Sequence, residues 1–196
     1  MISFDFLKWQ DPSRLPSWSY MCGWCGVYVN STAGWALLSG NAAMGGLYIC
    51  SNCQHPTLLN GPHQSPGPTV GQEVRHLPED VEALYREARR AITSDCYTAA
   101  VMLCRKILMH VAVAEGAKEG LSFLAYVDYL DSSGIIPKSG KGWIDHIRTK
   151  GNEANHEIVM MDREEATRLL QFIQMLLKLT FEFPSSVPGT ATTKAP

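Results

Sequence analysis

Six cysteines are the residues of this chain with the clearest capacity for chemistry, and four of them form two Cys-x-x-Cys pairs. Cys22 pairs with Cys25 and Cys50 with Cys53, and 24 residues separate the two pairs. A Cys-x-x-Cys turn directs both sulfur atoms at one metal ion, and two such turns complete the tetrahedral four-thiolate shell of zinc. The sequence therefore predicts one structural Zn2+ held by these four side chains.

Alternative interpretations of the cysteines remain open at this level. Disulfide bonds compete with zinc for any cysteine pair, although they are rare in the cytosol. His55, two residues after Cys53, can replace one sulfur as a ligand. Gly26 suits the tight turn after Cys25, which often needs a positive φ. The two remaining cysteines, Cys96 and Cys104, lie in a stretch with helical periodicity and are expected to be small core residues.

Arg148, Asn152 and His156 form a second candidate site. Successive members are four residues apart, so on a helix they stay within roughly an 80° arc of one face. An arginine binds phosphate through a planar, permanently charged fork, and a histidine moves protons near neutral pH. These groups are the minimum set for metal-independent RNA cleavage, in which the 2′-OH attacks its own phosphate. The alternative is structural, because such a ladder can also cross-link its helix to neighbouring helices by hydrogen bonds.

A change in charge density along the chain indicates two parts that must position these side chains. Residues 1–76 hold three basic and three acidic side chains, whereas residues 77–196 hold 14 and 16. A Pro/Gly-rich stretch at 60–71 marks the boundary. We expect an α+β chain that is mostly α. It comprises a small β zinc ribbon (1–59), a linker (60–76), an antiparallel bundle of about five helices (77–183) and a disordered tail (184–196).

Short β-prone runs predict the sheet of the ribbon, and helical periodicity predicts the bundle. The strands are expected at 27–29, 35–38 and 47–49, and metal binding supplies folding energy to so small a sheet. The aromatic side chains of the ribbon are expected to pack its core or to stack on bases, and they are Trp24, Tyr28, Trp35 and Tyr48. Of these, Trp24 is expected to be the most exposed. Helices are expected at about 78–91, from a cap at Ser94 or Asp95 to Gly116, and at 121–130, 140–156 and 163–181.

Composition narrows the class of protein. Hydrophobic residues make up 45% and charged residues 18%, which is ordinary for a globular chain. A net charge of −2 argues against a protein that coats nucleic acid through a basic face. No apolar run approaches the roughly 18 residues that span a bilayer, and the first residues do not resemble a signal peptide. We therefore expect a cytoplasmic protein that does not enter a membrane.

From about residue 22 to residue 183, the chain resembles the bacterial domain of unknown function 4145 family. The pattern of that family is an N-terminal zinc ribbon followed by a helical domain with an Arg-x-x-Gly-Asn-x-Ala-x-His motif, which residues 148–156 match in full. Residues 97–108 resemble its second helix, and residues 134–137 its turn before the motif. The helical domain is in turn similar to the HEPN superfamily (higher eukaryotes and prokaryotes nucleotide-binding). That superfamily includes ribonucleases of toxin–antitoxin, CRISPR and phage-defence systems, as well as inactive binding or dimerisation modules.

The resemblance implies roles for individual residues. Arg148 would hold the scissile phosphate, Asn152 belongs to the same motif, and His156 would act as general acid or base. A homodimer formed through the helical domain would bring two motifs into one cleft. Seven residues separate Arg148 from His156, against four to six in the usual HEPN nuclease motif, and Met109 stands where the family often has an acidic residue.

Two functions follow as the main expectations, and a nucleic-acid reader without chemistry is a third, which the near-neutral net charge disfavours. The first is a zinc-binding interaction module with a protein partner. It would be an accessory or regulatory component of a bacterial or phage defence or nucleic-acid-processing system. The second is a metal-independent HEPN-type ribonuclease that acts on RNA as a dimer through Arg148 and His156.

Overall fold

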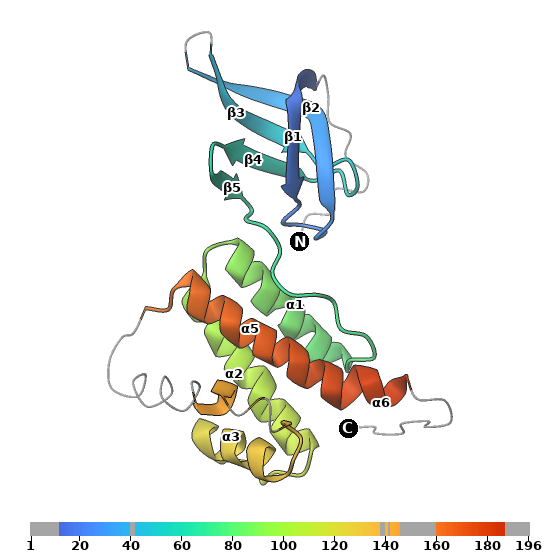
Figure 1. Cartoon of the computed structure of the whole chain (residues 1–196), viewed down its shortest axis with the longest axis vertical. Helices are drawn as coiled ribbons and strands as arrows, with labels where there is room; N and C mark the ends of the chain where they lie inside the picture. The colour runs from blue at the N-terminus through green and yellow to red at the C-terminus, as the bar shows by residue number, and fades with distance from the viewer. Residues whose placement is uncertain (1–11, 40–41, 138–139, 141, 146–159, 187–196) are drawn as a thin grey trace. The chain divides into compact units, whose positions relative to one another are not determined.

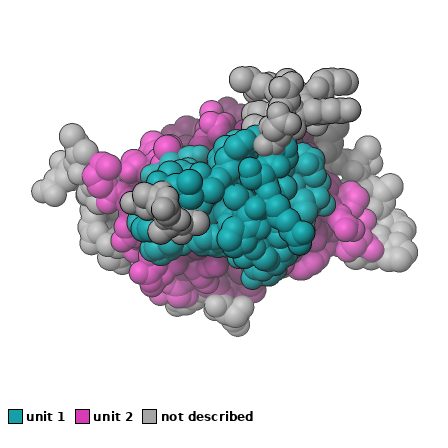
Figure 2. Space-filling model, turned by 90° about the horizontal axis from the view of Figure 1, so that it is seen from above, with its two compact units in different colours: residues 1–70, 93–95 teal, residues 71–92, 96–196 magenta. Residues whose placement is uncertain are grey.

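A computed structural model of the chain describes residues 12–39, 42–137, 140, 142–145 and 160–186. A five-stranded antiparallel sheet precedes a set of helices, which confirms the predicted α+β class (Figure 1). Contacts divide the chain into two units, residues 1–70 with 93–95 and residues 71–92 with 96–196 (Figure 2). The sheet lies in the first unit and the helices lie in the second, apart from the end of the first helix.

The sheet is a meander, in which each strand pairs with the next along the chain. Its strands are β1 (Ser13–Met21), β2 (Tyr28–Ser39), β3 (Ala42–Ile49), β4 (Pro56–Asn60) and β5 (His63–Ser65). The long β2 joins two of the predicted runs. The sequence did not predict β1, which contains Pro16 and shifts its register against β2 between Arg14 and Trp18. The shift interrupts the period-two pattern by which strands are recognised.

One side of the sheet carries a small core that is continuous with the cysteines. Its buried members are Leu15, Tyr20, Cys22, Val29, Tyr48, Cys50 and Leu59. The Trp18 ring packs edge-on against Tyr48, with ring centroids 5.7 Å apart. Two of the seven core side chains are thiols of the predicted zinc site. The packing of the sheet and the placement of the cysteines therefore depend on each other.

The predicted linker, residues 60–76, contains ordered structure. It includes β5, which pairs with β4 through Leu58 and Ser65. Further along, Gln72 is held inside the second unit. Its N–H donates to the Gln174 side chain at 2.8 Å, and its carbonyl oxygen accepts from the Tyr85 hydroxyl at 2.9 Å. The Pro/Gly-rich composition therefore reflects a hairpin and turns, because short strands and turns use the same residue types as linkers.

The helices lie close to their predicted positions. They are α1 (Glu79–Thr93), α2 (Tyr97–Ala114), α3 (Phe123–Ser132) and α5 (Arg163–Leu177), followed by the π-helical η2 (Lys178–Glu182) and the short α6 (Phe183–Ser185). α2 packs against α3 and α5. Of the predicted helix at 140–156, residues 142–145 are helical, and residues 146–159 lie outside the described residues.

α2 is the central helix of the second unit. Its buried side chains are Ala100, Val101, Cys104, Ile107, Leu108, Val111 and Ala112. Among the described residues it is the one helix that is long and apolar enough to cross a membrane by length and composition. The same two properties are typical of a core helix, and the buried stripe that faces the other helices accounts for them here.

Three details of the helical unit differ from expectation. The N-cap position of α2 is Cys96 instead of Ser94 or Asp95, because Asp95 takes a left-handed φ of 58° just before the helix. Cys96 is exposed, so the prediction that it is a core residue was wrong, whereas Cys104 is buried. The helix expected at 163–181 changes to π-helical geometry after Leu177, and α6 includes the first residues of the predicted tail.

Candidate metal centre

Two backbone turns of the same design carry the four cysteines. The first turn begins at Cys22, whose carbonyl oxygen accepts from the Gly26 N–H at 2.9 Å. The second begins at Cys50, whose carbonyl oxygen accepts from the Gln54 N–H at 3.0 Å. Gly26 and Gln54 both have left-handed backbones, with φ of 71° and 62°. The positive φ expected at Gly26 is therefore present, and a glutamine adopts the same conformation in the second turn.

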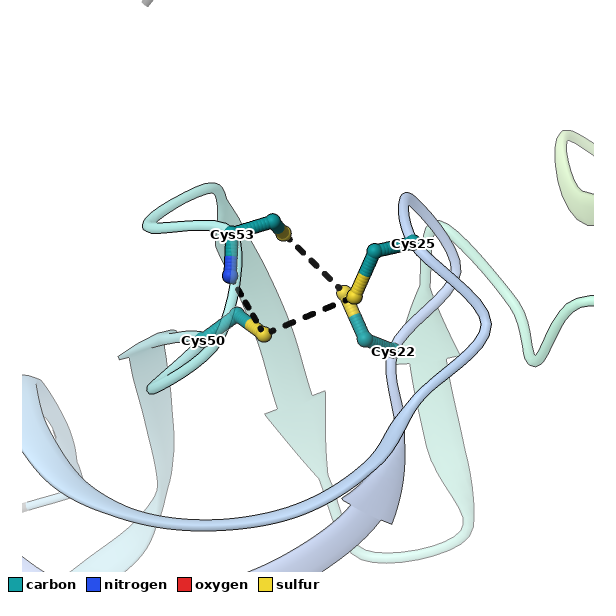
Figure 3. A group of neighbouring side chains, drawn as sticks. All are labelled: Cys22, Cys25, Cys50 and Cys53. Carbon is teal, nitrogen blue, oxygen red and sulfur yellow. Dashed lines mark hydrogen bonds between the residues drawn. The ribbon is translucent and has the colours of Figure 1, made fainter. Parts of the chain in front are cut away.

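The two turns direct their sulfur atoms at one another (Figure 3). The Sγ atoms of Cys22 and Cys53 are 3.7 Å apart, and those of Cys25 and Cys50 are 3.9 Å apart. All four sulfurs lie within 4.8 Å of one another. A tetrahedral site with a metal–sulfur distance of about 2.3 Å has sulfurs about 3.8 Å apart, whereas disulfide sulfurs are about 2.05 Å apart. The arrangement therefore fits four thiolates around one metal ion.

Hydrogen bonds to the sulfurs come from the same two turns. The Trp24 N–H donates to the Cys22 sulfur at 3.4 Å, and the Cys53 N–H donates to the Cys50 sulfur at 3.5 Å. The Asn52 side-chain amide donates to the Cys25 sulfur at 3.5 Å. Such donors favour the thiolate form, which is the form that binds a metal.

The thiols differ in their readiness to lose a proton. Burial raises the pKa of Cys22 to about 11 and raises the pKa of Cys53 as well. Burial also acts on Cys25, but hydrogen bonds from the Asn52 side chain and the Val27 backbone outweigh it and lower the pKa of Cys25 to about 7. A metal ion that enters this site must therefore displace protons from at least some of the thiols, because only thiolates bind it.

His55, which was considered as a possible metal ligand, instead contacts the backbone and an aromatic ring. Its Nδ1 atom lies 3.0 Å from the Cys53 carbonyl oxygen, and its ring packs against Trp24 with centroids 5.0 Å apart. The Trp24 indole N–H donates to the Pro56 carbonyl oxygen at 2.8 Å. Among the described residues, the group that could hold a metal ion consists of the four cysteines and does not include His55. The ring of His55 instead packs against Trp24, and this contact links the first cysteine turn to the second.

Two buried hydroxyls beside the cysteines were not found from the sequence. Tyr20 is 4% exposed and Thr57 is fully buried. Within the part of the chain that the structure describes, neither hydroxyl has a hydrogen-bond partner. Burial raises the pKa of Tyr20 to about 12, the Thr57 hydroxyl acts in the opposite direction, and the Cys50, Cys22 and Cys53 thiols add to the rise. Tyr20 lies on β1 and Thr57 on β4. The sequence predicted neither strand, so no signal marked these two positions.

The second candidate site, Arg148, Asn152 and His156, lies outside the described residues. The next described residues lead into α5. The Met161 N–H donates to the Thr98 hydroxyl at 3.3 Å, and Asp162 caps α5 by accepting from the Glu165 N–H at 2.8 Å. The chain that follows the motif is thus attached to the start of α2 and then enters α5.

Comparison with protein families identifies the helical unit. The family described as "Domain of unknown function (DUF4145)" matches residues 86–194, which include α2, α3, α5 and the motif at 148–156. No curated protein and no solved structure matches the chain. The match covers more than half of the 196 residues and confirms the resemblance seen in the motif. The chain belongs to the DUF4145 family.

Proposed function

We propose that this protein is a zinc-binding interaction module with a protein partner, and that it serves a bacterial or phage defence or nucleic-acid-processing system in the cytoplasm. The carrying observation is the surface of the sheet unit, which exposes several large apolar side chains along a stretch of chain that is almost free of charged residues. Between Arg14 and Glu73 the sequence contains no lysine, arginine, aspartate or glutamate. Nucleic-acid binding through the phosphate backbone needs cations, so this surface suits a protein.

The exposed apolar side chains concentrate on the same unit. Tyr28 is 69% exposed and Trp24 is 49% exposed. The large exposed apolar residues of the described chain in this unit are Met21, Trp24, Val27, Tyr28, Leu37, Leu38, Met44 and Leu58, against Met102, Met160 and Phe183 elsewhere. Exposed aromatic residues without nearby charges are typical of the buried centre of a protein interface.

Zinc is the metal that suits the cysteine centre best. A tetrahedral set of four sulfurs is typical of zinc or of an iron–sulfur centre. Zinc needs no inorganic sulfide, and four thiolates close its shell, so the ion is proposed to be structural and not catalytic. Elemental analysis of the purified protein should find one zinc per chain. A chain with two disulfides and no zinc would contradict this part of the proposal.

The interaction surface is tested by comparing variants in the capture of partners from the native host. Tyr28→Ser combined with Leu58→Ser removes two exposed apolar side chains without touching a cysteine. Met102→Ser is the matched control, because Met102 is 60% exposed but lies on α2. The double variant should retain its zinc and lose the partner that the wild type and the control retain. Equal capture by all three proteins would contradict a docking role for the sheet unit.

The complete motif from Arg148 to His156 favours a second function. This function is metal-independent ribonuclease activity of a homodimer formed through the helical domain. The purified protein would then cleave RNA without added divalent ions. Arg148→Ala, Asn152→Ala and His156→Ala should each reduce or abolish cleavage. Arg168→Ala controls for the loss of a positive charge, since Arg168 is an exposed residue of α5 that pairs with Glu164. Cleavage that survives the Arg148 and His156 substitutions would eliminate this site.

A further inference from the structure

The buried hydroxyls of Tyr20 and Thr57 call for an explanation. Buried polar groups in folded proteins are almost always hydrogen-bonded, because an unpaired one keeps its full cost of desolvation. Tyr20 is 4% exposed and Thr57 is fully buried, and among the described residues neither hydroxyl finds a partner. A change at the neighbouring cysteine centre that supplies an acceptor would satisfy them.

Strand geometry brings both hydroxyls to the side of the sheet that carries the cysteines. Tyr20 is the last residue but one of β1, and Cys22 follows that strand directly, with both side chains buried in the same cluster. Thr57 on β4 is the cross-strand partner of Tyr48, which lies two residues before Cys50. Tyr20, Cys22 and Cys50 belong to one buried cluster. Tyr20 and Cys50 are 4% and 0% exposed, so both side chains are enclosed in that cluster.

The charge of a loaded centre requires such donors. Four thiolates around one divalent ion leave a net charge of about −2, and Arg14 is the one charged side chain in residues 12–70. Hydrogen-bond donors are the groups that this part of the chain supplies to stabilise such a charge at the buried sulfurs. The Cys50 sulfur already accepts from the Cys53 N–H at 3.5 Å, and a thiolate can accept more than one hydrogen bond. The Tyr20 O–H is a buried donor in the same cluster, and it has no partner among the described residues.

We propose that the Tyr20 hydroxyl donates a hydrogen bond to the Cys50 sulfur of the metal-loaded centre, and that the Thr57 hydroxyl donates to the Tyr20 oxygen. The inference rests on the proposed zinc site. Tyr20 is then a positioning residue, which acts on the metal through Cys50. Groups of this kind orient a ligand and stabilise its charged form, and their removal typically weakens metal binding by about 10- to 100-fold.

The experiment compares three variants of the full chain. Tyr20→Phe removes the donor and keeps the ring, and Thr57→Val removes the second hydroxyl at nearly constant volume. Tyr48→Phe is the matched control, because Tyr48 is a 2%-exposed tyrosine of the same core whose hydroxyl donates to the Pro16 carbonyl oxygen at 3.1 Å. The zinc dissociation constant is measured by competition with a chromophoric chelator. The sulfur-to-metal charge-transfer band is measured after replacement of zinc by Co2+.

Tyr20→Phe is expected to raise the zinc dissociation constant by about 10- to 100-fold, with a smaller rise for Thr57→Val and a change of less than about twofold for Tyr48→Phe. The cobalt charge-transfer band should move to lower energy in Tyr20→Phe and stay in place in Tyr48→Phe, because a thiolate that loses a hydrogen bond is easier to oxidise. If Tyr20→Phe does not fold, the zinc dissociation constant of Thr57→Val tests the same hydrogen bonds, because Thr57 is proposed to donate to Tyr20.

The outcomes separate this inference from the proposed zinc site. If the wild type binds one zinc and Tyr20→Phe matches Tyr48→Phe in affinity and spectrum, the hydrogen bond is disproved and the zinc site stands. A wild type that binds no zinc would overturn the site and this inference together.

Discussion

The Sγ atoms of Cys22 and Cys53 lie 3.7 Å apart, although 31 positions separate the two residues along the chain. β2 and β3 lie between them, so this contact closes a loop that contains two of the five strands. Cys22 and Cys50 are completely buried in the same cluster as Tyr20 and Tyr48. A metal ion at this point would link the β1–β2 connection to the β3–β4 connection and hold the small core together.

Loss of one cysteine should therefore unfold the sheet unit. Cys22→Ser removes a ligand from a fully buried position, and structural zinc sites contribute on the order of 10 kcal/mol to folding. The variant should lose its zinc by elemental analysis and lose the slowly exchanging amides of residues 13–60 in hydrogen exchange. Cys96→Ser serves as the control, since Cys96 is exposed and lies outside the cluster. Persistent protection of the sheet in zinc-free Cys22→Ser would show that the metal is dispensable.

The spacing of the cysteines in the sequence predicted the two turns that carry them. Each Cys-x-x-Cys pair fixes its own turn, so the cysteine turns and the positive φ at Gly26 follow from a few neighbouring residues. Long helices were predictable for a similar reason, because the apolar positions of α2 and α5 repeat every three or four residues along one face. The family was recognised from a contiguous motif, residues 148–156, that lies within the matched range.

The features that were missed depend on pairing between distant segments. β5 has three residues and exists through its pairing with β4, so its composition resembles that of a linker. The burial of Tyr20 and Thr57 depends on how the strands close around the cysteines, and no local pattern encodes it. Gln54 adopts a conformation that usually needs glycine, because the hydrogen bonds of the cysteine turn impose it.

The left-handed position in the first cysteine turn should be sensitive to substitution. A Cβ added at Gly26 would meet no atom nearer than Thr69 at 3.7 Å, so Gly26→Ala should cost only the backbone penalty, about 1–2 kcal/mol. Gln54→Gly should relieve a similar penalty in the second turn. Gly142→Ala should instead stabilise by up to about 1 kcal/mol, because Gly142 is helical and none of the described residues lies within contact distance of an added Cβ. Urea denaturation of the zinc-loaded proteins measures all three, and a neutral Gly26→Ala would contradict the geometry of the turn.

The six cysteines should react with thiol reagents in three stages. Cys96 is exposed and should be modified in the native, metal-loaded protein. The four clustered thiols should become reactive when a chelator removes the metal, which brings the total to five. Cys104 should react last, after denaturation, because it is completely buried and burial raises its pKa to about 12. Mass spectrometry after alkylation counts the modified sites. Modification of five thiols before chelation would contradict a metal bound by the cluster.

Tyr85 should make the stability of the helical unit depend on pH above about 10. Its hydroxyl is buried and donates to the Gln72 carbonyl oxygen at 2.9 Å, and burial raises its pKa although Arg89 acts in the opposite direction. Below pH 10 the phenol keeps its proton in the folded and unfolded states, so its contribution to stability is complete. As the pH rises further, the unfolded state loses the proton first, and the free energy of unfolding falls.

Tyr85→Phe isolates this contribution. The variant should be about 1 kcal/mol less stable than the wild type at pH 7, because it lacks the hydrogen bond to Gln72. Above pH 10 the difference should shrink, since phenylalanine has no proton to lose, while the other tyrosines affect both proteins equally. Urea denaturation at pH 7, 10 and 11 measures the change. A difference between wild type and variant that stays constant over this range would show that Tyr85 ionises equally in the folded and unfolded chain.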